Sequence, residues 1–363
     1  MRVVAKIGTS SLTHDDGTIS REAVDRLCGE VADLRRDGHE VVVVSSGAIG
    51  AGLPALGLSG DRRPTDPLTL QAVSAVGQSR LVGVYNEALG AHGLVAGQVL
   101  LTPLDFMMRQ QYLHARATIE RLLELGVVPV VNENDAIADD EIRFGDNDRI
   151  AALVAHLVGA DLLVLLTDQA GMLTADPRID ATASLIEEIV EVDAALEQLA
   201  GGAGTVRGSG GMASKLAAAK IAAWSGVRTV IAAAHRDGVL TGAAAGEPGV
   251  GTVVQPRSER LSARKLWIAF AVASEGRLTV DDGARRALVE GTSSLLAAGV
   301  RAVDGSFGAG MAVEVADTAG VVFAKGLARR DADGVRDVAG KRSGDLPDGE
   351  PEVIHRDDLV VLP

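Results

Sequence analysis

The stretch from residue 127 to residue 158 contains most of the polar side chains whose types and spacing could do chemistry. A short β-branched run at 127–131 is followed by two groups of carboxylates and amides, and then by apolar residues at helical spacing (Asn132, Glu133, Asn134, Asp135, Asp139, Asp140, Glu141, Asp146, Asn147 and Asp148). A buried strand that leads into such a set is typical of a ligand site in an open α/β sheet. The alternative interpretation is a solvated acidic loop in which Asp146 and Asn147 cap the next helix. The stretch by itself predicts a site for a polar ligand.

Two lysines stand next to loops that could face an anion. Lys6 lies inside the apolar run 3–7, and Gly8 with three hydroxyl residues follows it. Lys215 follows a glycine-rich segment, 201–211, at the start of an alanine-rich helical pattern. The backbone N–H groups of such loops and helix starts can bind phosphate. The alternatives are a solvent-facing lysine at a sheet edge and a flexible linker, respectively.

A third strand-to-helix turn, after the valine run 41–44, holds Ser45, Ser46 and Gly47. These small residues suit a carboxylate or a phosphate, although tight packing alone also explains them. Cations, glycine-rich backbone and carboxylates together form the inventory that phosphoryl transfer needs. A hydride-transfer enzyme would carry a glycine-rich dinucleotide turn after its first strand, and a serine hydrolase would carry a G-x-S-x-G elbow; the sequence has neither. One cysteine and seven histidines give no zinc-type ligand set.

These residues need a scaffold of alternating strands and helices. Apolar strands are expected at 3–7, 41–44, 95–101, 127–131, 161–166 and 227–232, and helical patterns at 20–37, 68–92, 109–125, 149–158 and 213–225. This alternation predicts an α/β fold with a mostly parallel sheet sandwiched by helices, and a site at the carboxyl ends of the strands. Aromatic residues make up only 2% of the chain, so valine, leucine and alanine must form the core.

Beyond about residue 266 the pattern changes to short strands separated by glycine and aspartate turns. Strands expected at 276–280, 299–303, 311–315 and 321–326 predict a second, small β-rich domain. We therefore expect a catalytic domain over 1–258 that ends with the strand at 227–232, a linker over 259–274 and the second domain over 275–363. The stretch 240–264 is rich in glycine and turn signals, and it is expected to hold the boundary.

The composition argues against several classes of protein. The 363 residues carry a net charge of −14, which disfavours general binding to nucleic acid or to an anionic membrane. No apolar run approaches the length of about 18 residues that a membrane span needs, and no signal-peptide pattern opens the chain. A cytoplasmic protein is therefore expected. The single Cys28 lies in an amphipathic helical pattern, where core packing is its expected role.

Eight short motifs follow one another along the chain (Lys6 to Ser10, Ser45 to Ile49, Ala75 to Arg80, Asn132 to Asp135, Phe144 to Asp148, Leu166 to Gly171, Thr174 to Arg178 and Gly210 to Met212). Their types and order resemble those of the amino acid kinase family, in particular of its members that phosphorylate the γ-carboxylate of glutamate. The C-terminal part resembles a PUA domain (through Arg264 to Ile268, Asp281 to Ala284, Gly291 to Leu296 and His355 to Asp358). Each motif is weak alone, but together they cover nearly the whole chain.

The resemblance implies ATP-dependent phosphorylation of the γ-carboxylate of L-glutamate to γ-glutamyl phosphate, the first step of proline biosynthesis. It implies contacts to glutamate from three residues (Ser46, Asp135 and Asn147). It implies that three residues are catalytic, two lysines at the phosphates and an aspartate that orients them (Lys6, Lys215 and Asp148). The implied nucleotide-binding residues lie in three loops and at one helix start (Lys6, Gly8, Thr167, Asp168, Ser209, Gly210, Gly211, Met212 and Lys215).

The resemblance also implies ATP and Mg²⁺ as cofactors, no metal ligand among the side chains, a homo-oligomer (dimer or tetramer) and proline as feedback inhibitor. The chemistry fits, because a carboxylate acceptor and a phosphate donor repel each other and need flanking cations. No general base is needed, since the γ-carboxylate is ionised at neutral pH. The glycine-rich loop departs from the family pattern at Ala213, where the family more often has a hydroxyl residue, and at Ser209, where it more often has threonine.

Two alternatives stay open. One is another amino acid kinase of the aspartokinase or acetylglutamate kinase type, against which the second domain and the polar groups 132–135 and 146–148 argue. The other is RNA binding through the second domain, which has a basic group (Arg329, Arg330, Arg336, Lys341 and Arg342). The 16 acidic and 11 basic residues of 275–363 give that domain a net charge of −5, which argues against RNA, and the basic group is explained by an ordinary solvated surface.

Overall fold

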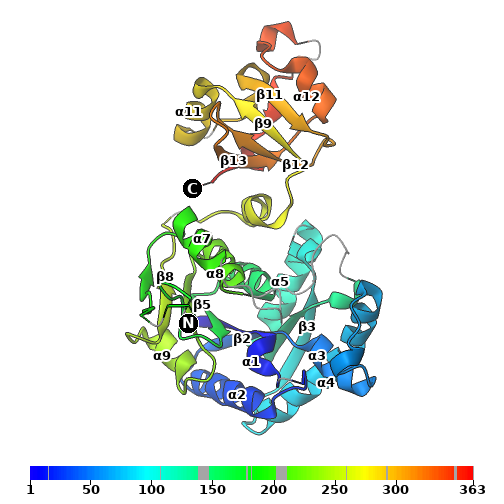
Figure 1. Ribbon diagram of the computed structural model, residues 1–363, viewed down its shortest axis with the longest axis vertical. Coiled ribbons are helices and arrows are strands. Elements are labelled where there is room, and N and C mark those ends of the chain that lie inside the picture. The colour runs from blue at the N-terminus through cyan, green and yellow to red at the C-terminus, as the bar shows by residue number, and fades with distance from the viewer. Residues whose placement is uncertain are drawn as a thin grey trace. The chain divides into compact units, whose positions relative to one another are not determined.

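A computed structural model of the chain describes every residue except 15, 107, 138–146, 177–178, 181, 202–210, 259, 292, 347–349 and 363. The chain divides into two compact units, Met1–Arg260 and Leu261–Pro363, and each unit has its own sheet (Figure 1). The domain bounds expected from the sequence stay predictions. The segment expected as a linker contains α10 (Ala263–Leu266) and a π-helix (Trp267–Ala271).

The first unit is built on an eight-stranded sheet in the order β3-β4-β2-β1-β5-β7-β8-β6. The strands are β1 (Arg2–Ile7), β2 (Glu40–Ser45), β3 (Ala96–Leu101), β4 (Val128–Glu133), β5 (Leu162–Thr167), β6 (Glu188–Ile189), β7 (Arg228–Ala233) and β8 (Gly251–Val254). Neighbouring strands pair in parallel except β7 and β8. The central strands are rich in valine and leucine and buried along almost their whole length, as expected for a parallel sheet covered on both faces. The predicted fold class is confirmed.

Helices cover both faces of this sheet (Figure 1). One face carries α2 (Arg21–Arg36), α4 (Pro67–Gly90) and α9 (Val239–Ala245), which share a core with β1 and β2. The other face carries α5 (Arg109–Glu124), α6 (Asn147–Leu157) and α8 (Met212–Trp224), with α7 (Ala194–Gly201) packed on α8. Shorter helical elements follow strands β1, β2, β3 and β4: α1 (Thr9–Leu12), α3 (Ala48–Ala55), η2 (Pro103–Phe106) and η3 (Asp135–Ile137). A further turn, η1 (Gly60–Arg62), lies between α3 and α4.

The starts of the two longest helices on the first face follow from their sequences. The Ser20 hydroxyl accepts a hydrogen bond from the Ala23 N–H at the start of α2. The Asp66 carboxylate does the same for the Thr69 N–H at the start of α4, where Pro67 occupies the first helical position. Such caps satisfy N–H groups that have no partner within the helix.

The second unit is β-rich, as predicted. Its five-stranded sheet has the order β11-β9-β12-β13-β15, and β10 pairs with β14 beside it. The strands are β9 (Gly276–Val280), β10 (Leu295–Leu296), β11 (Val300–Gly305), β12 (Ala312–Ala316), β13 (Val322–Leu327), β14 (Glu352–Ile354) and β15 (Leu359–Val361). The helical elements are α11 (Asp282–Glu290), α12 (Ala332–Val338), η5 (Ala297–Gly299), η6 (Ser343–Asp345) and η7 (Arg356–Asp358).

One sequence-based expectation about the first unit is wrong. The strand expected at 227–232 is β7, but it is not the last strand of the sheet, because α9 and β8 follow it. Nearly all of α9 and the whole of β8 lie in the glycine-rich stretch 240–264, where the sequence indicates a domain boundary. In the described part of the chain, no helix is long and apolar enough to cross a membrane.

Candidate active site

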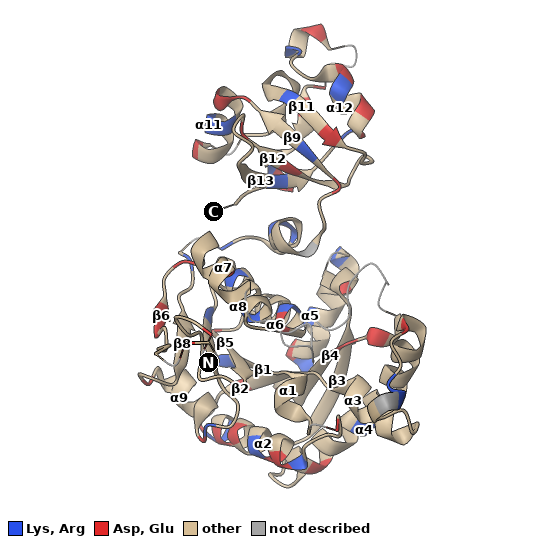
Figure 2. Cartoon of the chain, viewed as in Figure 1, with Lys and Arg blue, Asp and Glu red and all other residues tan. Residues whose placement is uncertain are grey.

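The predicted site residues gather at one edge of the large sheet. β4, β2, β1 and β5 are adjacent and parallel, so their carboxyl ends lie side by side and carry four of these residues (Lys6, Ser46, Asp135 and Thr167). The first turns of α6 and α8 add Asp148 and Lys215. In Figure 2 the strands of this sheet are mostly free of charged residues, which lie largely on helices and loops. The few charges at the strand ends therefore stand out as a separate set.

Lys6, Asp148 and Lys215 form a buried cluster of two cations around one anion. The Lys6 ammonium lies 2.5 Å from Oδ1 of Asp148, and the Lys215 ammonium lies 3.3 Å from Oδ2. The Ser214 hydroxyl donates to the same Oδ2 at 3.1 Å. All three charged side chains are at most 5% exposed. Because charged groups are rarely buried without a partner, Asp148 explains how both lysines can sit inside the unit.

This geometry decides between the two interpretations of Lys6. β1 is a central strand, not an edge strand, and Lys6 is 3% exposed. Burial by itself would raise the pKa of the Asp148 carboxyl, but the adjacent Lys6 and Lys215 ammonium groups lower it below the ordinary value of 3.8. The carboxylate is thus ionised at neutral pH. The cluster holds one positive charge in excess, which favours an anionic ligand such as a phosphate.

Asp135 and Asn147 lie near the end of β4, which is separated from β1 and its Lys6 by β2. Asp135 is buried, and its Oδ2 accepts a hydrogen bond from the Ser74 hydroxyl at 2.8 Å. Burial raises the pKa of this carboxyl, and the bond from Ser74 opposes the shift. Oδ1 of Asn147 accepts from the backbone N–H of Glu133 at 3.2 Å, which fixes the start of α6 against β4.

α4 contributes two buried polar residues, Ser74 and Gln78. Ser74 lies outside the motifs noted in the sequence, whereas Gln78 lies within the motif Ala75 to Arg80 but carried no predicted role. The Gln78 side chain donates to the Glu133 carbonyl at 3.2 Å and accepts from the Asn132 amide at 3.3 Å. Gln78 and Ser74 are both buried and stand four residues apart, so they share one face of the helix. The sequence could have indicated them, because two polar residues four positions apart lie on a face of α4 that is otherwise made of small and apolar residues.

Close packing of α3 against α4 brings the turn at Ser46 to the same place. A Cβ atom on Gly77 of α4 would lie 1.7 Å from the Ala48 carbonyl oxygen of α3, so only glycine permits this approach. Gly47 has φ of +99°, a left-handed conformation that favours glycine, and α3 begins directly after it. Ser46 is buried at this turn, and its N–H donates to the Ile7 carbonyl of β1 at 3.2 Å.

The predicted nucleotide residues lie around the lysines, as far as they are described. A Cβ atom on Gly8 would lie 3.3 Å from the Lys6 ammonium, so a larger residue at this position would crowd that group. The Thr167 hydroxyl donates to the Asp168 carboxylate at 3.0 Å. Gly211 precedes α8 and Met212 begins the helix, and a helix start of this kind is suited to an anion. The predicted residues Ser209 and Gly210 lie outside the described part of the chain.

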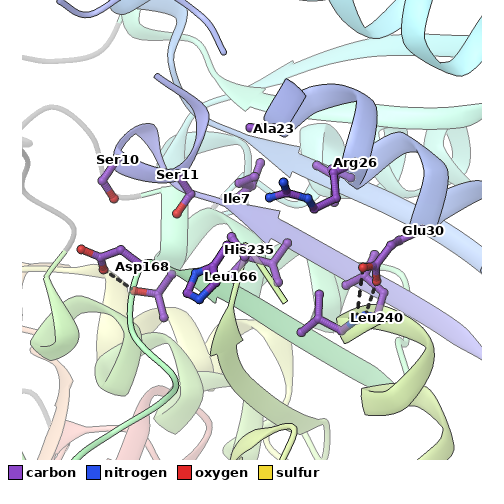
Figure 3. A pocket seen from close by; sticks show the side chains of 14 residues that line it. Ile7, Ser10, Ser11, Ala23, Arg26, Glu30, Leu166, Asp168, His235 and Leu240 are labelled. Atoms are coloured by element: carbon purple, nitrogen blue, oxygen red, sulfur yellow. Dashed lines mark hydrogen bonds between the residues drawn. The ribbon is translucent and has the colours of Figure 1, made fainter. Parts of the chain in front are cut away.

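A cavity of about 190 Å³ opens beside these residues, on the face of the sheet that α2 and α9 cover (Figure 3). Its lining includes Thr167 and Asp168 but none of the three residues of the lysine cluster. Glu30 on its wall accepts hydrogen bonds from the Val239 and Leu240 N–H groups at 3.1 and 2.6 Å and so ties α2 to α9. The cavity therefore adjoins the predicted nucleotide residues Thr167 and Asp168 without including the lysine cluster, and sequence reasoning did not predict it.

Within the described residues, no group of three or more histidine, cysteine, aspartate or glutamate side chains is arranged to hold a metal ion. Both carboxylate oxygens of Asp148 are already engaged by lysines. The described side chains therefore do not form a cage for Mg²⁺. They suit a metal that enters with the phosphates of a nucleotide, which is how Mg²⁺ is commonly bound.

Comparison with known proteins identifies both units. The sequence pattern described as "Amino acid kinase family" matches residues 1–233. The chain belongs to the amino acid kinase family. The pattern described as "PUA domain" matches residues 276–348. Both resemblances drawn from the short motifs are thereby confirmed.

Relatives of this amino acid kinase align along nearly the whole chain. A protein named glutamate 5-kinase from Myxococcus xanthus is 48% identical over 99% of this chain and 96% of its own length. Proteins of the same name from Marinomonas sp. and Caldanaerobacter subterraneus are 45% and 44% identical, over 99% and 100% of this chain and 97% and 98% of their own lengths. The similarity therefore covers the PUA domain as well as the kinase domain.

Proposed function

We propose that this amino acid kinase transfers the γ-phosphoryl group of ATP to the γ-carboxylate of L-glutamate and so forms γ-glutamyl phosphate. Two observations support the proposal. Relatives that are 44–48% identical over nearly the full chain carry the name glutamate 5-kinase. The structural support for the proposal is the buried cluster of Lys6, Asp148 and Lys215, because its two cations can bring two anionic substrates together.

The reaction is a displacement at phosphorus. A γ-carboxylate oxygen of glutamate attacks the γ-phosphorus of ATP, the bond from this phosphorus to the β,γ-bridging oxygen breaks, and ADP leaves with the electron pair. The acceptor is already an anion at neutral pH, so no side chain has to remove a proton. The catalytic task is electrostatic: Lys6 and Lys215 reduce the repulsion between carboxylate and phosphate, and Asp148 holds the two lysines in position.

The acceptor side of the edge suits an amino acid. Glutamate has a single cationic group, its α-ammonium, and the buried carboxylate of Asp135 is the natural partner for it. The hydroxyl of Ser46 and the amide of Asn147 are suited to contact the carboxylates of the substrate. Thr167, Asp168 and the start of α8 would hold ATP, whose Mg²⁺ neutralises part of the phosphate charge when bound.

Several finer properties come from the resemblance alone. We propose that proline, which also has an α-amino acid head, inhibits by competing for the acceptor site. We also propose that the chain works as a homo-oligomer, a dimer or a tetramer. RNA binding by the PUA domain is not part of this proposal, because the net charge of 275–363 is −5, from 11 basic and 16 acidic residues.

An assay with a panel of acceptors tests the proposed function. Purified protein is given ATP and Mg²⁺ with L-glutamate, L-aspartate, N-acetylglutamate or carbamate, and hydroxylamine traps any acyl phosphate as a hydroxamate. The expected result is hydroxamate with L-glutamate only. Hydroxamate with another acceptor would support a kinase activity but would contradict L-glutamate as its substrate. No turnover with any acceptor would overturn the proposed function and bring the RNA-binding alternative forward.

A further inference from the structure

One hydrogen bond links the predicted acceptor site to α4, through a serine that lies just before the motif Ala75 to Arg80. Ser74 lies in the second turn of α4 and is 0% exposed. Its hydroxyl donates at 2.8 Å to Oδ2 of Asp135, a residue 61 positions further along the chain. A serine inside a helix can instead satisfy its hydroxyl by bonding to a carbonyl one turn back. This serine reaches across to another element.

The surroundings hold this contact in place. Gln78, one turn later on the same face of α4, binds the Glu133 carbonyl at 3.2 Å, two residues before Asp135. Gly77 between them permits the close approach of α3, which also holds α4 in place. α4 and the short helix η3, which begins at Asp135, are packed against each other. The position of the Asp135 carboxylate is thus set by α4.

We propose that Ser74 is a positioning residue for the acceptor: its hydroxyl fixes the Asp135 carboxylate in the orientation that receives the α-ammonium group of the amino acid. This inference rests on the proposed function. Asp135 is the group that would touch the substrate, and Ser74 acts through it. Ser74 is therefore expected to influence how tightly the amino acid binds, and to leave ATP binding and the chemical step nearly unchanged.

The test compares Ser74→Ala with Ser79→Ala, a matched control. Ser79 lies on the same helix, is exposed, and donates to the Val76 carbonyl of its own turn at 3.2 Å. We expect Ser74→Ala to raise KM for L-glutamate about tenfold or more, the usual effect of losing a hydrogen bond to a charged group. kcat at saturating glutamate and KM for ATP should stay within about twofold of the wild type, and Ser79→Ala should resemble the wild type throughout.

A double-mutant cycle separates positioning from a merely structural role. If Ser74 acts through the charge of Asp135, then Ser74→Ala should change KM for glutamate much less in an Asp135→Asn background than in the wild type. If Ser74→Ala folds poorly, Ser74→Cys takes its place in the cycle. Cysteine is similar in shape and a weaker donor, so a smaller rise in KM is expected.

The outcomes are distinct. A glutamate KM in the Ser74 variants equal to that of Ser79→Ala would overturn the inference. It would also be overturned if Ser74→Ala raised KM for glutamate by the same factor in the Asp135→Asn background as in the wild type. In both cases the wild type still forms the hydroxamate, so the proposed function would stand. A wild type that forms no hydroxamate with glutamate would instead overturn the proposed function, and this inference with it.

Discussion

Replacing Asp148 by asparagine removes one negative charge from between two buried cations while keeping the shape of the side chain. The Coulomb attraction of Asp148 to each lysine, at 2.5 and 3.3 Å, is on the order of 5 to 7 kcal/mol at an effective dielectric constant of about 20. The cost of removing three ions from water offsets most of this attraction. The variant, however, keeps two of the buried ions and loses only their partner. Such a loss typically costs about 3–5 kcal/mol of folding stability.

Thermal unfolding measures this loss. In a domain of about 250 residues, 1 kcal/mol corresponds to about 2–4 °C in Tm, so we expect Asp148→Asn to lower Tm by on the order of 10 °C. The pKa of Asp148 is lowered in the folded protein, so its stabilising effect is fully present above the ordinary value of 3.8 and is lost as the pH falls below it. The measurement at pH 7 to 8 therefore reports the full effect.

Asp33→Asn is the matched control, because Asp33 pairs with Arg36 at 2.9 Å on the surface of α2. Exposed pairs contribute about 0–1 kcal/mol, so this variant should unfold almost like the wild type. kcat of Asp148→Asn should fall at least about tenfold, because the lysines lose the group that orients them. An Asp148→Asn protein with the Tm and kcat of the Asp33 control would refute the view that the cluster is held by this carboxylate.

Three further predictions concern the same edge of the sheet. Lys6→Ala and Lys215→Ala should each lose most of kcat while KM for glutamate changes less, and wild-type turnover in either variant would contradict the role of that lysine. Gly77→Ala should destabilise the first unit by several kcal/mol, because its Cβ would lie 1.7 Å from the α3 backbone, whereas Gly83→Ala on the same helix meets nothing within 4 Å and should gain about 0.5–1 kcal/mol; denaturant unfolding compares the two. Burial raises the pKa of Asp135, so lowering the pH should raise KM for glutamate while the pH is still above the ordinary value of 3.8, and an Asp135→Asn variant that keeps this pH dependence would contradict the assignment.

The fold of the first unit follows from its sequence where the pattern is strong. The valine run at 41–44 lies within β2, the apolar run at 161–166 differs from β5 by one residue at each end, and the helical pattern at 109–125 nearly coincides with α5. The sequence did not predict α9 and β8, because both are short and lie in a glycine-rich stretch. Their packing depends on long-range contacts such as the bonds from the α9 backbone to Glu30 on α2, which no local pattern shows.

The site was predictable in its residue types and only partly in its contacts. The family motifs indicated Lys6, Asp148 and Lys215, and the strand order places them together. Ser74 was not recognised, and Gln78 entered only as a member of the motif Ala75 to Arg80 with no role assigned, since a serine and a glutamine in a long helix usually face solvent. Only the close approach of α3, η3 and β4 shows that they face inward.

The central claim, that the γ-carboxylate of glutamate attacks the γ-phosphorus of ATP, can be followed through one oxygen atom. L-glutamate labelled with a heavy oxygen isotope in its γ-carboxylate is incubated with enzyme, ATP, Mg²⁺ and hydroxylamine, and the released phosphate is analysed by mass spectrometry. Attack by the carboxylate leaves one of its oxygens between carbon and phosphorus. Hydroxylamine then attacks the carbonyl carbon and expels phosphate that keeps this oxygen. We predict one labelled oxygen in each phosphate, whereas unlabelled phosphate would mean that water accepted the phosphoryl group and would contradict the account.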